Sequence, residues 1–81
     1  MHRELDRGRL ISTMAFALRH DPGHFDLQLD DEGWTSFEDL VIAIRFERHE
    51  WDALDESIVR AVISDMDRFE IREGRIRAVY G

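Results

Sequence analysis

The sequence contains no cysteine and no lysine, and only one of its 81 residues is proline. The lack of cysteine excludes a disulfide framework and thiolate zinc sites, and it is typical of cytoplasmic proteins. The chain has no apolar run near the roughly 20 residues that a membrane-spanning helix needs, and no signal-peptide pattern. These absences predict a cytoplasmic protein with no membrane partner. A chain of this length has room for one small domain with a single core.

Because lysine is absent, all 11 basic side chains are arginine, and the formal net charge is −7. Residues 25–67 contain three Arg against thirteen acidic residues, whereas residues 1–24 and 68–81 each have a small excess of Arg. A phosphate is therefore expected to approach only the two ends of the chain. The acidic middle leaves a second possibility, in which the chain imitates nucleic acid toward a basic partner.

Residues 9–20 are predicted to form the helix around which the rest of the chain is organised. Five apolar residues recur at helical spacing and predict a buried stripe: Leu10, Ile11, Met14, Ala17 and Leu18. Phe16, Arg19 and His20 share another face at the C-terminal end. Asp21-Pro22 ends the helix, because proline cannot continue the hydrogen-bond ladder. Arg19 and His20 either cap the helix against its dipole or bind an anion, and their position alone leaves both open.

The segments around this helix carry weaker signals. Residues 1–8 are predicted to be a polar lead-in, and residues 9–81 a single domain. Residues 25–29 alternate apolar and polar side chains, which predicts a short extended segment. A turn at residues 30–33 then leads to a second extended segment at Trp34 and Thr35.

The second half of the chain predicts two more helices and a hairpin. The helices are expected at residues 36–47 and 53–65, the latter with Asp52 or Asp55 as its N-cap. Residues 68–72 and 75–79 flank Glu73-Gly74 and are predicted to pair as an antiparallel hairpin. This order predicts an α+β fold that is winged-helix-like, with three helices plus a C-terminal β-hairpin.

The helical and strand patterns also predict which side chains are buried. We expect seven residues to be mostly buried: Trp34, Phe37, Leu40, Ile58, Val62, Phe69 and Ile71. The buried side of the third helix is expected to include Leu54, Ile58, Ala61 and Val62. Trp34 is either a lid on the core or a platform on which a base stacks. Phe16, in contrast, is expected to be exposed beside Arg19 and His20.

Four short motifs follow one another in this chain. They are Leu18-Arg19-His20-Asp21-Pro22, Leu27-x-Leu29-Asp30-x-x-Gly33-Trp34, Arg68-Phe69 and Ile76-Arg77-Ala78-x-x-Gly81. Their succession resembles the N-terminal lobe of the NAD-dependent RNA 2'-phosphotransferases, which remove the splice-junction 2'-phosphate from transfer RNA. The resemblance runs from about Arg9 to Gly81. The Leu-Arg-His and Ile-Arg-Ala elements together carry most of it.

The resemblance implies catalytic roles for Arg19, His20 and Arg77, with Arg75 joining them in binding RNA phosphates. In the family, the RNA 2'-phosphate attacks NAD and expels nicotinamide, and ADP-ribose 1'',2''-cyclic phosphate is then released. The family continues beyond the position of Gly81 with an NAD-binding lobe, and this chain has no glycine-rich turn between a strand and a helix. We therefore expect no cofactor site in this chain, although NAD is the co-substrate of the full-length family. We also expect the chain to be inactive without the second lobe.

Two functions remain open from the sequence. The first is an RNA-phosphate-binding lobe whose partners are RNA with a 2'-phosphate and a missing NAD-binding lobe. The second is a small acidic winged-helix interaction module, without catalysis, that binds a basic protein. Duplex DNA binding by the third helix is disfavoured, because that helix is strongly acidic and phosphate binding needs a row of cations. No metal site is predicted, since His20 and His24 have no evident third ligand nearby.

The sharpest hypothesis is that Arg19, His20 and Arg77 converge on one anion site. Like charges repel one another unless an anion compensates them. In the simpler alternative, Arg19 caps the first helix, His20 is solvated, and Arg77 pairs with Glu70 across the hairpin.

Overall fold

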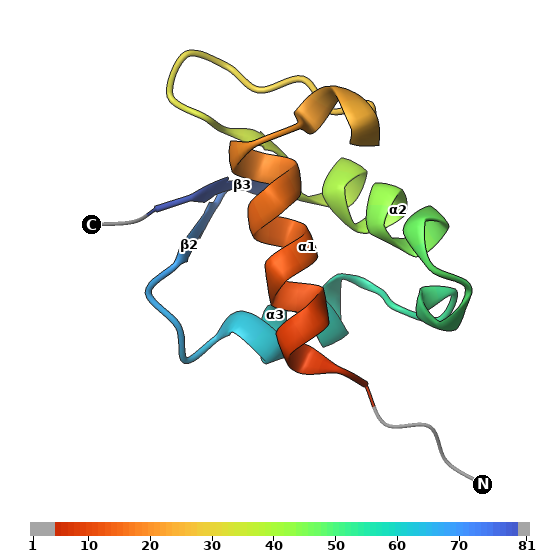
Figure 1. Cartoon of the computed structure of the whole chain (residues 1–81). Helices are drawn as coiled ribbons and strands as arrows, with labels where there is room; N and C mark the ends of the chain where they lie inside the picture. Colours follow the sequence, from red (N-terminus) through yellow and green to blue (C-terminus); the bar gives the residue numbers. More distant parts are fainter. Residues whose placement is uncertain (1–4, 80–81) are drawn as a thin grey trace, which may run out of the picture.

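A computed structural model describes residues 5–79 and contains three α-helices, two short 3₁₀ helices and three strands (Figure 1). The elements are α1 (Arg7–Arg19), η1 (Pro22–Phe25), β1 (Thr35–Ser36), α2 (Phe37–Glu47), η2 (His49–Trp51), α3 (Glu56–Ile63), β2 (Phe69–Arg72) and β3 (Arg75–Ala78). The predicted α+β class is confirmed, whereas the winged-helix likeness stays a prediction. Residues 1–4 of the predicted lead-in, and Tyr80 and Gly81, lie outside the described residues.

Helix α1 begins two residues earlier than predicted because Asp6 caps it. The Asp6 carboxylate accepts a hydrogen bond from the backbone N–H of Arg9 at 3.0 Å, which satisfies an amide that the helix itself leaves unpaired. The helix ends at Arg19, with His20 as its C-cap, immediately before Asp21-Pro22. The predicted stop is therefore confirmed to within one residue.

The prediction of a short extended segment at residues 25–29 is wrong, because Phe25 belongs to a 3₁₀ helix and no strand forms there. Pro22 opens the 3₁₀ helix η1, and the Asp21 carboxylate accepts from the backbone N–H of His24 at 3.2 Å. Proline and an aspartate cap favour such a turn more strongly than the alternation of side chains favours a strand. Phe25 and Leu27 are nevertheless buried, so the alternation identified the buried side chains correctly.

The three strands form one antiparallel sheet in the order β1-β3-β2. Glu73 and Gly74 both have positive φ, which suits the tight turn between β2 and β3. The hairpin pairs Glu70 with Arg77 and Arg72 with Arg75, which is the predicted register. Strand β1 pairs with the other side of β3, so that β3 is the central strand.

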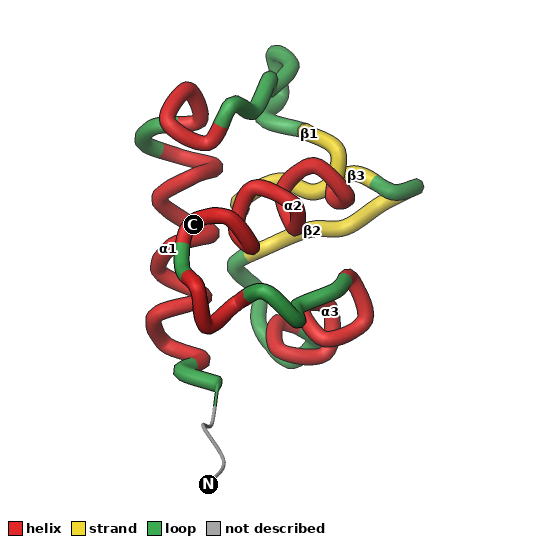
Figure 2. The backbone as a smooth tube through the Cα atoms, turned by 90° about the vertical axis from the view of Figure 1, so that its right-hand side faces the viewer, coloured by secondary structure: helices red, strands yellow, loops and turns green. Residues whose placement is uncertain are grey.

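Helix α2 follows β1 without a loop (Figure 2). It packs against the other elements through one apolar face. The Ser36 hydroxyl accepts from the backbone N–H of Asp39 at 3.1 Å, as the capping pattern predicts. The buried residues of α2 are those expected from helical spacing: Phe37, Leu40, Val41 and Ile44. Because β1 joins α2 without a loop, the packing of α2 on the core also fixes the position of β1.

Helix α3 is shorter than predicted and presents a different face to the core. It begins at Glu56, with Asp55 as the N-cap, and buries Val59, Val62 and Ile63. Ile58, predicted to be buried, is 40% exposed, and Ala61 is exposed. The error has a simple cause. Leu54 is buried but precedes the helix, so a helical phase extrapolated from Leu54 points to the wrong residues.

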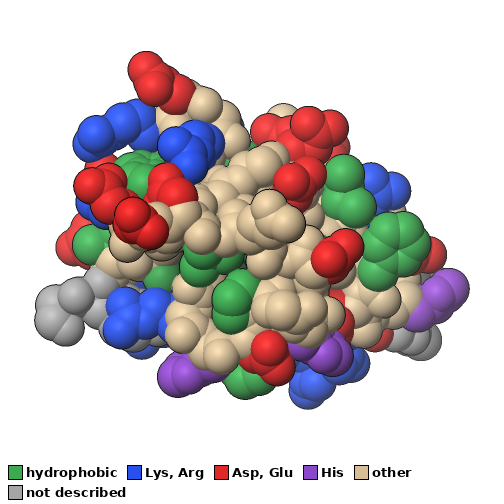
Figure 3. Space-filling model, turned by 90° about the horizontal axis from the view of Figure 1, so that it is seen from above, with side chains coloured by type: hydrophobic (Ala, Val, Ile, Leu, Met, Phe, Trp, Pro, Cys, Tyr) green, Lys and Arg blue, Asp and Glu red, His purple; other side chains and the backbone are tan. Residues whose placement is uncertain are grey.

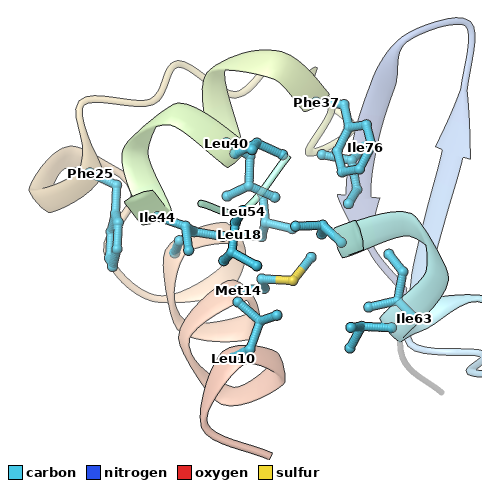
Figure 4. Packing of buried hydrophobic residues seen from close by; sticks show 14 of the residues in the cluster. Leu10, Met14, Leu18, Phe25, Phe37, Leu40, Ile44, Leu54, Ile63 and Ile76 are labelled. Atoms are coloured by element: carbon cyan, nitrogen blue, oxygen red, sulfur yellow. The ribbon is translucent and has the colours of Figure 1, made fainter. Parts of the chain in front are cut away.

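The core lies where α1, α2, α3 and β3 meet. Leu10, Met14 and Leu18 of α1 belong to one buried cluster with Leu40 and Ile44 of α2 (Figure 4). Of the seven residues predicted to be buried, Trp34, Phe37, Leu40 and Val62 are buried. Phe69 and Ile71 are only partly buried, because β2 is an edge strand whose inner face is incompletely covered. Within residues 5–79, no helix has the length and apolar character required to span a membrane.

Candidate functional site

The C-terminal end of α1 presents an exposed aromatic ring beside two basic residues. Phe16 is 44% exposed, as predicted, and its ring stacks on the His20 imidazole with the centroids 5.8 Å apart. The Phe25 ring of η1 meets the Phe16 ring edge-on at 6.2 Å. Arg19 is the basic residue of the last helical turn, where a cation interacts favourably with the helix dipole. We call Phe16, Arg19 and His20 the helix-end group.

Arg77 lies on the central strand β3, on the face of the sheet opposite to the core. Glu70 is its direct cross-strand partner on β2, and the Glu70 carboxylate accepts from Arg77 Nε at 3.0 Å and lies 2.9 Å from Nη2. On the other side of β3, the Arg77 guanidinium lies over the Trp34 ring, 4.7 Å from its centroid. The pairing of Arg77 with Glu70 that the simpler alternative predicted is thus confirmed.

Arg75 is held by a different acid. Its guanidinium lies 2.6 Å from the Asp30 carboxylate, which also accepts from the backbone N–H groups of Trp34 at 3.0 Å and Glu32 at 2.9 Å. The hydrogen bond from Trp34, together with those from Glu32 and Arg75, lowers the pKa of Asp30 below its ordinary value. Asp30 therefore organises the turn before β1 and ties it to β3.

Helix α1 packs against β3, and Figure 1 shows the strand passing beside the C-terminal half of the helix. This packing brings the two basic segments of a chain of net charge −7 into neighbouring elements. Acidic side chains are scattered over the face seen in Figure 3. Convergence of Arg19, His20 and Arg77 on one anion stays a prediction.

An open cleft of about 540 Å³ adjoins the helix-end group on the exposed side of α1. Its walls include Phe16, and its polar groups include His24 and Glu47, which lie 3.3 Å apart. Basic and acidic side chains are mixed there, so the cleft has no strong preference for an anion. Among residues 5–79, no group of three or more histidines and carboxylates could hold a metal ion.

Trp34 was predicted to be buried, but its contacts differ from those of a lid on the core. It is buried, but it is not part of the main core cluster, and it lies under the guanidinium groups of Arg72 and Arg77 instead. The prediction of a lid on the core is therefore correct about the burial of Trp34, but it missed the contacts of the ring with Arg72 and Arg77. The missing information was the pairing of β1 with β3, which brings Trp34 beside Arg77.

A family model described as "RNA 2'-phosphotransferase, Tpt1 / KptA family" matches residues 6–81. This chain belongs to that family. The match includes all four residues singled out as site candidates, namely Arg19, His20, Arg75 and Arg77. The resemblance inferred from the four motifs is confirmed.

Curated relatives of this RNA 2'-phosphotransferase family align with nearly the whole chain. A probable RNA 2'-phosphotransferase of Acetivibrio thermocellus is 38% identical over 79 residues, which are 95% of this chain and 43% of the relative. One from Pyrococcus abyssi is 43% identical over 76 residues, 93% of this chain and 40% of the relative. One from Aeropyrum pernix is 39% identical, covering 93% and 34%. The chain thus spans less than half of the length of these relatives.

Proposed function

We propose that this chain is the RNA-phosphate-binding N-terminal lobe of an RNA 2'-phosphotransferase. In this proposal Arg19, His20 and Arg77 contact the 2'-phosphate at the splice junction of transfer RNA, and Arg75 contacts a neighbouring RNA phosphate. The observation that carries the proposal is that the C-terminal end of α1, with Arg19 and His20, lies beside β3, with Arg75 and Arg77, in a chain of net charge −7 (Figure 1). A cytoplasmic location is part of the proposal.

The side chains of Arg19, His20 and Arg77 suit the transfer of a phosphoryl group from one oxygen to another. Guanidinium groups donate paired, charge-assisted hydrogen bonds to phosphoryl oxygens, and an imidazolium adds a third donor. Such donors stabilise negative charge as it moves between oxygens. The chain's share of the reaction is then to bind and orient the RNA phosphate and to offset its charge.

Residues 5–79 do not fit a dinucleotide site of the kind built on a glycine-rich turn between a strand and a helix. The one strand that leads directly into a helix is β1 before α2 within the described residues, and the junction is Ser36-Phe37, without the glycines that let a backbone approach a pyrophosphate. We therefore derive no NAD-dependent step from this chain. In the proposal NAD binds to a second lobe, and the chain alone is inactive.

A binding measurement tests the proposal. At low salt, where charge interactions are strongest, we expect the chain to bind a short RNA with an internal 2'-phosphate at least about tenfold more tightly than the same RNA with a 2'-hydroxyl, because a dianion adds charge-assisted contacts. Arg19→Ala and Arg77→Ala should each abolish most of this difference. Fluorescence anisotropy with the two labelled RNAs measures it.

Arg9→Ala is the matched control, because Arg9 lies at the other end of α1 and pairs with Asp6. It should leave the preference for the 2'-phosphate unchanged. Equal binding of the two RNAs by the unmodified chain would overturn the proposal and favour the acidic interaction module instead.

A further inference from the structure

Three residues form a row across the sheet on the face away from the core. The register places Glu70 of β2 directly opposite Arg77 of β3, and Trp34 immediately precedes Thr35, the partner of Ile76 in β1. Residues in register across neighbouring strands point to the same face. Trp34, Arg77 and Glu70 therefore share one face, with the arginine in the middle, while Thr35 and Ile76 are buried on the other.

The contacts in this row hold the Arg77 guanidinium on three sides. The Trp34 ring lies 4.7 Å from the guanidinium. Glu70 Oε1 accepts from Nε at 3.0 Å and lies 2.9 Å from Nη2, and the carbonyl oxygen of Glu32 accepts from Nη1 at 3.4 Å. A guanidinium has five N–H groups. Among the described residues, Nε and Nη1 each donate one hydrogen bond and Nη2 contributes the ion pair, so at least one N–H on each terminal nitrogen remains for a further acceptor.

Glu70 is itself fixed by a second arginine. Arg72 Nη2 lies 2.7 Å from the other carboxylate oxygen of Glu70, and the Arg72 guanidinium also lies over the Trp34 ring at 5.8 Å. The Glu70 side chain is only 28% exposed and the Arg77 side chain 32%. Partial burial on an aromatic platform restricts the rotamers of both side chains, so less freedom is lost when a ligand binds.

We propose that Trp34 and Glu70 are positioning residues for Arg77. They hold its guanidinium so that the two remaining N–H groups present a bidentate edge to a phosphate oxygen pair. This inference rests on the proposed function, because the phosphate is the 2'-phosphate of RNA. The inference predicts the direction in which Glu70 changes the affinity for RNA. If the Glu70 carboxylate only competed with the phosphate for Arg77, it would weaken RNA binding. If it orients Arg77, it strengthens RNA binding.

The test compares Glu70→Gln and Glu73→Gln, two isosteric changes that each remove one negative charge from the same hairpin. Binding of the 2'-phosphorylated RNA is measured by anisotropy, and folding is checked by thermal unfolding. We expect Glu70→Gln to weaken binding by about fivefold to tenfold through loss of a charge-assisted contact, and Glu73→Gln to change it less than twofold. Tighter binding by Glu70→Gln would overturn the proposal.

Trp34 is tested by Trp34→Leu, with Trp34→Phe as the conservative variant that restores an aromatic platform. We expect weaker binding for Leu and recovery for Phe at equal folded fraction, and equal loss in both would overturn the role of the ring.

A signal that needs no RNA separates this proposal from the function itself. The Arg77 Nε–H resonance should be sharp and slow to exchange in the unmodified chain, and broadened in Glu70→Gln. If the chain does not prefer the 2'-phosphate, the proposed function fails, and this signal still decides whether Glu70 holds Arg77. A resonance that is unaffected by Glu70→Gln would overturn the positioning.

Discussion

At the residue scale, Asp30 links the turn before β1 to the central strand. It accepts from two backbone amides of its own turn and pairs with Arg75, 45 residues away in sequence. Its motif position, Asp30-x-x-Gly33-Trp34, has a structural explanation. The carboxylate forms the turn, Gly33 takes the positive φ of 88° that the turn requires, and Trp34 is delivered to the face beside Arg77.

Asp30 should make the stability of the chain sensitive to acid. Because its pKa is lowered from 3.8 in the folded state, the carboxylate stabilises the fold above that pH, and this stabilisation is lost as the pH falls through the folded pKa. We expect Asp30→Asn to lower stability at neutral pH and to reduce the loss of stability below pH 3.8. Urea unfolding at neutral and acidic pH measures both effects.

Asp31→Asn is the control for this prediction, since Asp31 is exposed in the same turn. It should behave like the unmodified chain. An unchanged acid profile in Asp30→Asn would show that the contacts of Asp30 contribute nothing to folding.

At the scale of elements, the sequence correctly predicted the caps, helix faces and turns that depend on interactions between residues close together in the chain. Each of four features is determined within a few residues: the Ser36 cap, the apolar face of α2, the end of α1 before Asp21-Pro22, and the Glu73-Gly74 turn. The failures have non-local or competing causes. The face of α3 depends on Leu54 packing before the helix starts, and the burial of Trp34 under arginine depends on a strand pairing between residues about 40 apart.

The corrected face of α3 can be tested with two neighbouring residues. Val59 is fully buried and Ile58 is 40% exposed. We expect Val59→Ala to destabilise the chain by about 2 kcal/mol and Ile58→Ala by less than about 1 kcal/mol, although isoleucine loses more carbon atoms. Chemical denaturation measures the two free energies of unfolding. The reverse order would restore the face predicted from the sequence.

At the scale of the whole molecule, the sequence identified the family and the candidate cations but not their surroundings. The charge pattern showed that basic residues gather at the two ends of the chain, and the fold packs those ends together through α1 and β3. The hairpin pattern predicted the pair between Arg77 and Glu70, but nothing in the sequence showed that Asp30 engages Arg75. Asp30 lies 45 residues before Arg75, and only the pairing of β1 with β3 brings the two together.

The isolated chain should not remove a 2'-phosphate from RNA. It spans less than half of the length of its curated relatives, and residues 5–79 contain no glycine-rich turn between a strand and a helix. The assay follows release of the phosphate from labelled 2'-phosphorylated RNA with NAD, with the full-length Pyrococcus abyssi relative as the positive control. Turnover by the 81-residue chain alone would contradict the proposed division of labour.

The central claim is that one RNA phosphate is bound jointly by the helix-end group and β3. The most direct measurement is a single NMR titration with a 2'-phosphorylated dinucleotide at low salt, which follows the ring signals of His20 and the guanidinium signals of Arg19 and Arg77 together. We predict that all three residues respond with one common midpoint, and that the dinucleotide without the 2'-phosphate produces no such response. Different midpoints, or a response confined to one of the two segments, would contradict the claim.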